Sequence, residues 1–180
     1  MSTYRHCRRI LTCSRYDPTI EDSYSVTRTV DGRSYHLSLT DTAGQEEYRG
    51  LWAASNLHSD AFLLVYDITN AASLEGLQWY LEMLEIETEN RIEENYRLLK
   101  EKGHRVRGKA EEGWRSPPIM IAAGNKCDLK NARVISSKSG WEWAKNHGCG
   151  FMETSARELV NIEETFARML LYPSESLYDG

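Results

Sequence analysis

The chain of 180 residues carries 22 Lys and Arg residues against 27 Asp and Glu residues, which gives a formal net charge of −5. This length predicts one domain that can bury a hydrophobic core. The acidic balance argues against nucleic acid as a partner, and no apolar run is long enough to cross a membrane. The four cysteines lack C-x-x-C spacing, which indicates reduced thiols in a cytosolic protein rather than a disulfide framework or a zinc site.

Neither end of the sequence carries a lipidation signal. Residues 1–15 form an atypical basic segment with four arginines and no acid, for which an organellar transit peptide is the alternative. Residues 173–180 form a short tail without cysteine, and Ser2 follows Met1, so neither prenylation nor myristoylation is predicted. We therefore expect no intrinsic membrane anchor.

The first predicted elements form a β-hairpin. Residues 26–30 and 35–40 are β-branched, aromatic and alternating in character, and Asp31-Gly32 lies between them. This dipeptide favours a tight hairpin turn, because both of its central positions require a positive φ.

Apolar runs and helical repeats alternate in the rest of the chain. Residues 61–66 and 119–123 read as strands buried on both faces, and residues 151–153 read as a shorter third strand. Three helices are predicted: one on Leu74, Leu77, Leu81 and Leu84 with Ser73 as its N-cap, one over 137–146 and one over 162–170. This alternation predicts an α/β fold with a mostly parallel sheet and helices on both faces, whose ligands bind beyond the carboxyl ends of the strands.

The sequence DTAGQE, residues 41–46, follows the second strand of the hairpin. Asp41 can hold a hard cation through water, since Mg²⁺ keeps several of its waters. Gly44 lets a backbone N–H approach a phosphate oxygen, and Gln45 can orient a water for attack on a phosphoryl group. An ordinary turn is the alternative interpretation.

The sequence GNKCD, residues 124–128, follows the second buried strand. The Asp128 carboxylate can accept from the two adjacent N–H donors of a guanine edge, which adenine lacks. Asn125 can tie the loop to its neighbours, and the stem of Lys126 can lie across a base. A solvated Asn/Asp turn is the alternative.

Two further segments carry weaker signals. After the third strand comes ETSAR, residues 153–157, where the N–H of Ala156 can donate to a base carbonyl; a plain helix cap is the alternative. Before the hairpin, residues 16–24 offer the Thr19 hydroxyl to a cation and the charges of Glu21 and Asp22 to a basic partner; a polar loop is the alternative.

The order of these four segments, each at a predicted strand boundary, resembles the Ras-type small GTPases, and residues 16–24 resemble the Ras/Rap branch. The resemblance covers residues 16–172 and implies a P-loop NTPase-like α/β domain. It implies a guanine-nucleotide switch that hydrolyses GTP to GDP with Mg²⁺ and that is served by effector proteins, exchange factors and GTPase-activating proteins. Members of this family usually sit on the inner face of the plasma membrane through a C-terminal lipid.

The resemblance also implies individual residue roles. Thr19 and Asp41 would bind Mg²⁺, Gly44 would bind the γ-phosphate, and Gln45 would position the attacking water. The guanine site would comprise Asn125, Lys126, Asp128, Ser155 and Ala156. The effector-binding residues would be Ile20, Glu21, Asp22, Ser23 and Tyr24, where a partner can add a strand.

The sequence departs from the family where the phosphate loop belongs. A strand, the loop G-x-x-x-x-G-K-[ST] and a helix need roughly two dozen residues before the Tyr16 position. The first 15 residues contain no glycine, so we expect the first strand, the phosphate loop and the first helix to be missing. The similar pattern at 103–110 ends in Ala110 instead of a hydroxyl residue, and it follows a charged stretch instead of a strand.

Two functional hypotheses follow from this departure. The first is a GTPase whose hydrolysis is impaired in this chain, with a misplaced gene start as one origin of the gap. The second is a pseudo-GTPase that acts as a non-cycling effector-binding module.

A polar insertion at about residues 87–116 is a second departure, because connections between a helix and a strand usually take about 2–6 residues. It reads either as a helical extension or as a solvated arm.

Overall fold

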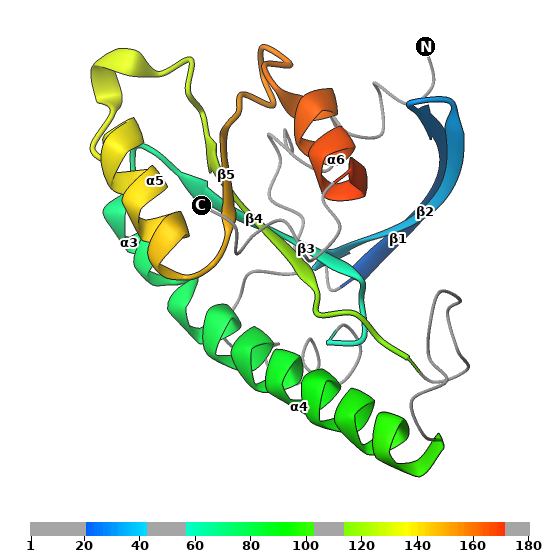
Figure 1. Ribbon diagram of the computed structural model, residues 1–180. Helices are drawn as coiled ribbons and strands as arrows, with labels where there is room; N and C mark the ends of the chain where they lie inside the picture. Colours follow the sequence, from blue (N-terminus) through cyan, green and yellow to red (C-terminus); the bar gives the residue numbers. More distant parts are fainter. Residues whose placement is uncertain (1–20, 43–56, 103–113, 172–180) are drawn as a thin grey trace.

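The computed structural model describes residues 21–42, 57–102 and 114–171. Its elements in chain order are β1 (Glu21–Val30), β2 (Arg33–Thr42), β3 (Ala61–Asp67), α3 (Ala71–Glu75), α4 (Gln78–Lys102), β4 (Ile119–Asn125), the 3-10 turn η2 (Lys130–Ala132), α5 (Ser137–Asn146), β5 (Gly150–Glu153) and α6 (Ile162–Leu171). Strands β3, β4 and β5 form a parallel sheet in that order, and β1 and β2 form a separate antiparallel pair (Figure 1). The predicted α/β class is confirmed.

The predicted hairpin is present, and its turn has the expected conformation. Asp31 and Gly32 have φ values of 48° and 75°, so both turn residues are left-handed. The pairing runs from Val30 opposite Arg33 to Glu21 opposite Thr42. Strand β2 is thus longer than the predicted 35–40, and Asp41 lies within the strand rather than after it.

The two faces of β3 are buried to different extents. Phe62, Leu64 and Tyr66 are buried against leucines of α4 and against Ala144 of α5. On the other face Val65 is 36% exposed. The prediction that this run is buried on both faces is wrong, because α6 covers the second face only in part.

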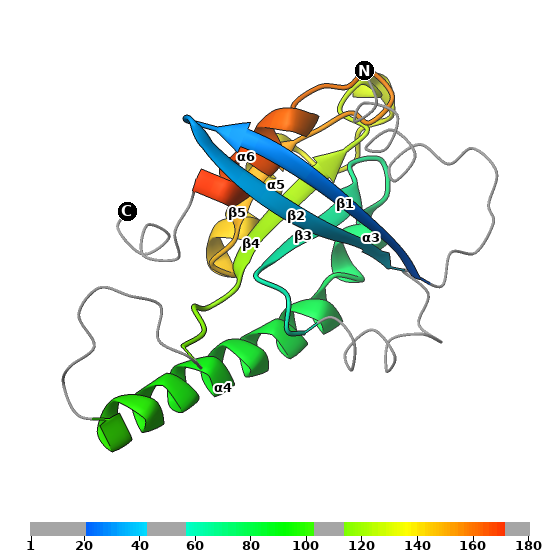
Figure 2. The ribbon, with the colours of Figure 1, turned by 90° about the vertical axis from the view of Figure 1, so that its right-hand side faces the viewer.

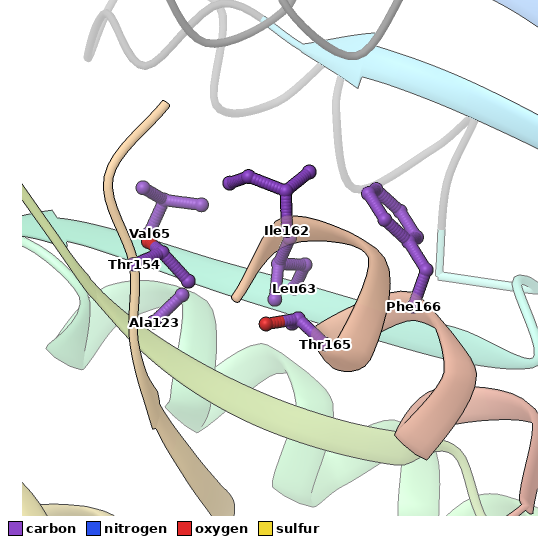
Figure 3. A pocket seen from close by; sticks show the side chains of 7 residues that line it. All are labelled: Leu63, Val65, Ala123, Thr154, Ile162, Thr165 and Phe166. Carbon is purple, nitrogen blue, oxygen red and sulfur yellow. The ribbon is translucent and has the colours of Figure 1, made fainter. Parts of the chain in front are cut away.

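Helix α6 lies on that second face. Ile162, Thr165 and Phe166 of α6 approach Leu63 of β3 and Ala123 of β4, as Figure 3 shows, and a space of about 10 Å³ remains between them. The sheet therefore carries helices on both faces, α4 and α5 on one and α6 on the other, as expected for a buried parallel sheet.

The leucine repeat forms two helices instead of one. Asn70 caps α3, since its side chain accepts a hydrogen bond from the backbone N–H of Ala72. Ser73, the predicted N-cap, lies inside α3, where its hydroxyl donates to the carbonyl of Asn70 at 2.6 Å. A second helix, α4, then begins at Gln78. The other two helical predictions, over 137–146 and 162–170, are confirmed within one residue.

Helix α4 continues to Lys102, far into the polar segment that was expected to be an insertion, and both ribbon views show it running past the sheet (Figure 2). Its inner face there is polar and buried. Arg91 is 2% exposed and donates to Glu87 and to the backbone carbonyls of Leu57, Ser59 and Ser116 at 2.7–3.1 Å. For residues 87–102 the helical extension is thus the correct interpretation, while 103–113 lie outside the described residues. None of the described helices is both long and apolar enough to span a membrane.

Candidate functional site

The carboxyl ends of the three parallel strands meet at one edge of the sheet. Asp67 at the end of β3 is in register with Asn125 at the end of β4, and Gly124 is in register with Glu153 of β5. Loops that leave this edge are the usual place for ligands in open α/β sheets. Residues 124–128 and 153–157 meet at this edge, and Gly124 and Asn125 still belong to β4, so the first segment begins within the strand rather than after it.

Backbone and side-chain hydrogen bonds join these two loops. The N–H of Thr154 donates to the carbonyl of Gly124 at 2.9 Å, and the N–H of Cys127 donates to the carbonyl of Thr154 at 3.0 Å. The side-chain oxygen of Asn125 accepts from the N–H of Ala156 at 3.2 Å. Asn125 therefore ties the loop to its neighbour, as predicted from the sequence.

The Asp128 carboxylate is oriented by a buried serine. The hydroxyl of Ser155 donates to one oxygen of Asp128 at 2.6 Å, and it also accepts from the N–H of Glu158 at 3.1 Å. Ser155 has no exposed surface, and Ala156 is buried beside it. An acceptor-only carboxylate held in this way is pre-oriented for a ligand that presents two adjacent N–H donors.

The ammonium group of Lys126 is paired with Asp67. Its Nζ lies 2.5 Å from Oδ2 of Asp67, and the lysine backbone is left-handed with a φ of 67°. The other carboxylate oxygen accepts from the N–H and the hydroxyl of Thr69 at 2.8 and 2.7 Å. Burial acts to raise the pKa of Asp67, but the hydrogen bonds from Lys126 and Thr69 outweigh it, so the pKa lies below its ordinary value.

A second ion pair joins the end of β5 to the segment that follows η2. Arg133 donates two hydrogen bonds to the carboxylate of Glu153, at 2.5 and 3.1 Å. Burial acts to raise the pKa of Glu153, yet the hydrogen bonds from Arg133 and Ser137 lower it overall. Sequence reasoning missed Asp67, Thr69 and Arg133. The only signal for Asp67 was its position directly after an apolar run, with a threonine two residues on.

The remaining candidate residues belong to the hairpin side of the molecule or lie outside the described residues. The second group comprises Thr19, Ile20, Gly44 and Gln45. Glu21, Asp22, Ser23 and Tyr24 lie on β1, where Asp22 is in register with Asp41 of β2 and Tyr24 with Leu39. The residues predicted to bind guanine thus meet at the sheet edge. The described residues predicted to bind effectors lie along one strand of the hairpin.

The donor set for Mg²⁺ is only partly within the described residues. Asp41 is a half-buried carboxylate near the end of β2, and such an oxygen ligand suits Mg²⁺. No group of three or more His, Cys, Asp and Glu side chains in the described ranges could hold a metal ion. Of the two predicted Mg²⁺ ligands, Asp41 thus lies within the described residues and Thr19 lies outside them.

Comparisons with known proteins show the family of the chain. A model of the Ras family matches residues 12–102 and 101–172. The chain is 34% identical over 154 residues to a protein named Ras-like protein B from Aspergillus fumigatus; the match covers 84% of this chain and 62% of that protein. The chain thus spans less than two thirds of that relative. With both matches covering most of its residues, the chain belongs to the Ras family of small GTPases.

Proposed function

We propose that this chain binds guanine nucleotides through its loops at 124–128 and 154–156 and that its capacity to hydrolyse GTP is impaired. The observation that carries the proposal is the Asp128 carboxylate, oriented by the buried hydroxyl of Ser155 at 2.6 Å. Asn125 and Ala156 join the two loops and support this geometry.

Recognition would depend on hydrogen-bond matching at the base edge. A guanine presents two adjacent N–H donors to the Asp128 carboxylate, whereas adenine leaves this acceptor without partners. An acceptor that is buried by the base without a partner costs about 1–3 kcal/mol. The charge on Asp128 strengthens the matched pair further.

The 180 residues offer fewer groups for binding the phosphates than the family usually does. Ras-family GTPases use GTP and GDP with Mg²⁺, but no G-x-x-x-x-G-K-[ST] sequence follows a strand here. The backbone amides and the lysine that usually hold the β- and γ-phosphates are therefore not supplied by this motif. We propose Thr19 and Asp41 as Mg²⁺ ligands, Gly44 as a γ-phosphate donor and Gln45 as the residue that positions the attacking water.

In the experiment, the purified chain is first loaded with a fluorescent guanine nucleotide as probe, in Mg²⁺-containing buffer. Unlabelled GTP, GDP, GMP and ATP are then titrated in as competitors. We expect guanine nucleotides to displace the probe while ATP does not, with GTP and GDP gaining only modestly over GMP because the phosphate loop is lacking. Asp128→Ala should weaken guanine binding by about tenfold or more, and GTP turnover should be slow or absent. Equal displacement by ATP and GTP would contradict the base site, and rapid turnover would contradict the impaired phosphate side.

A second candidate function is a non-cycling module that binds effector proteins. It is favoured by the hairpin, which presents Ser23 exposed on β1, with β1 paired to β2 along one edge. An effector would add a strand beside residues 20–24. Exchange factors and GTPase-activating proteins are the partners of the first function and would not be needed by the second. Effector binding that is unchanged by Asp128→Ala would favour this module.

A further inference from the structure

An ion pair lies beside the residues of the proposed guanine site, and the family resemblance gave its acidic member no role. Asp67 ends β3 directly beside Asn125, and Lys126 follows at the next position. The lysine ammonium meets Oδ2 of Asp67 at 2.5 Å. The lysine side chain is half exposed and the aspartate side chain is 22% exposed. The pair therefore bridges the ends of β3 and β4 near the surface.

The aspartate is held rigidly before any ligand arrives. Its Oδ1 accepts two hydrogen bonds from Thr69, and its backbone N–H donates to the hydroxyl of Ser73 at 2.9 Å. Lys126 adopts a left-handed backbone, which non-glycine residues seldom do. The carboxylate and the lysine backbone therefore both restrict the direction of the lysine stem.

We propose that Asp67 is a positioning residue of the guanine site, which holds the Lys126 ammonium so that the aliphatic stem forms a preformed wall for the base. This inference rests on the proposed function. A free lysine stem samples many rotamers, and fixing it before binding removes part of the entropy cost of binding. The stem is apolar along its length and suits contact with a flat base, while its charge stays with Asp67.

If Asp67 had a purely structural role, its effect on nucleotide binding would not depend on the charge of Lys126. A partly exposed ion pair contributes little to folding stability. Asp67→Asn keeps an oxygen for both hydrogen bonds from Thr69 and removes only the charge. If Asp67 acts through Lys126, the variant should fold normally and change the behaviour of Lys126, and its effect on binding should vanish when Lys126 has no charge.

The first measurement needs no nucleotide. Lysine amines of the folded chain are acylated at low reagent concentration, and labelling is quantified by mass spectrometry against Lys138, whose side chain is 82% exposed. We expect Asp67→Asn to raise the labelling of Lys126 by about threefold, the scale of a partly exposed ion pair. Asp67→Ser, which keeps an acceptor for Thr69, serves if the first variant does not fold. Unchanged labelling in a folded variant would overturn the proposal.

The second measurement is GDP binding to four proteins: wild type, Asp67→Asn, Lys126→Met and the double variant. Asp67→Asn should weaken binding about threefold in the wild-type background and have no effect in the Lys126→Met background. Glu164→Gln, which breaks an exposed pair with Arg168 on α6, is the matched control and should bind as wild type does. An equal loss in both backgrounds would show that Asp67 does not act through Lys126. Absence of GDP binding by the wild type would overturn the proposed function itself, whereas a binding wild type with an unaffected Asp67→Asn overturns only this inference.

Discussion

The two sides of the molecule that flank the parallel sheet are packed very differently. On the face covered by α4 and α5, Ile68, Leu81 and Leu84 have no exposed surface. On the other side, α6 leaves only about 10 Å³ against β3 and β4, but a cavity of about 320 Å³ remains between α6 and the hairpin. Its apolar lining includes Leu37 and Leu39 of β2, which stay half buried. We call it the hairpin–α6 cavity.

The difference follows from how each region is connected. The loops of the base site leave a continuous parallel ladder, and backbone hydrogen bonds join them to one another. The hairpin forms its own sheet, and in the described ranges no strand pairs it with β3. The candidate base site therefore has firm support, while the effector-type residues lie on a more loosely packed element.

The largest contrast should appear when leucines are truncated on the two faces. Leu81→Ala removes a fully buried side chain from the tight face and should lower the free energy of unfolding by about 2–5 kcal/mol. Leu39→Ala should cost less, about 1–2 kcal/mol, because its side chain is only partly buried and borders the cavity. Urea unfolding measures both. Equal losses would contradict the packing difference.

Adding one methyl group to the tight face should also be harmful. A Cβ on Gly140 would lie 2.2 Å from the hydroxyl of Tyr66 and 3.0 Å from Phe151, so Gly140→Ala should destabilise by about 1–3 kcal/mol. Among the described residues the buried Tyr66 hydroxyl has no hydrogen-bond partner, and burial raises its pKa to about 12.

A double-variant cycle isolates that hydroxyl. Tyr66→Phe alone should be neutral or stabilise by about 1 kcal/mol, since it removes an unpaired buried polar group. In the Tyr66→Phe background, Gly140→Ala should cost less than in the wild type, because the closest atom is gone. Thermal unfolding measures all four proteins, and an unchanged cost would place the clash on Phe151 instead.

The opposite sign is expected for added atoms in the hairpin–α6 cavity. Ala167 of α6 lines this cavity, and Ala167→Leu fills part of its volume. Cavity filling commonly stabilises by about 0.5–2 kcal/mol. We expect a higher unfolding midpoint, in contrast to the loss from Gly140→Ala. A destabilised Ala167→Leu would mean that the cavity is smaller in solution than in this structure.

Local chemistry made most of the fold predictable. Asp31-Gly32 determines its own turn, α5 begins after its Ser136 cap, and α6 follows from its apolar spacing. The extent of α4 was harder to predict, because Arg91 and Asn95 read as solvated polar residues. They are buried instead, since their partners are backbone carbonyls of residues 57–59 and 115–116, more than 20 positions away for Arg91. Such partners cannot be read from local pattern.

The candidate site was predictable to the level of its loops. Strand ends place 124–128 beside 154–156, and the bond from Ala156 to Asn125 was an expected kind of contact. Asp67 was not predicted, because its pairing with Lys126 depends on the register between β3 and β4. That register is a property of the assembled sheet. Sequence spacing between residues 67 and 126 does not contain it.

The smallest effect should come from the ion pair that bridges the hairpin and α6. Arg28 and Glu163 approach to 3.5 Å, with side chains 40% and 62% exposed. Arg28→Gln and Glu163→Gln should each change stability by less than about 0.5 kcal/mol, with a coupling energy that 1 M salt removes. A coupling above about 1 kcal/mol would mean that charge anchors the hairpin. A negligible coupling means that the apolar lining of the cavity holds it, which is why filling the cavity should strengthen this side more than any change at its rim.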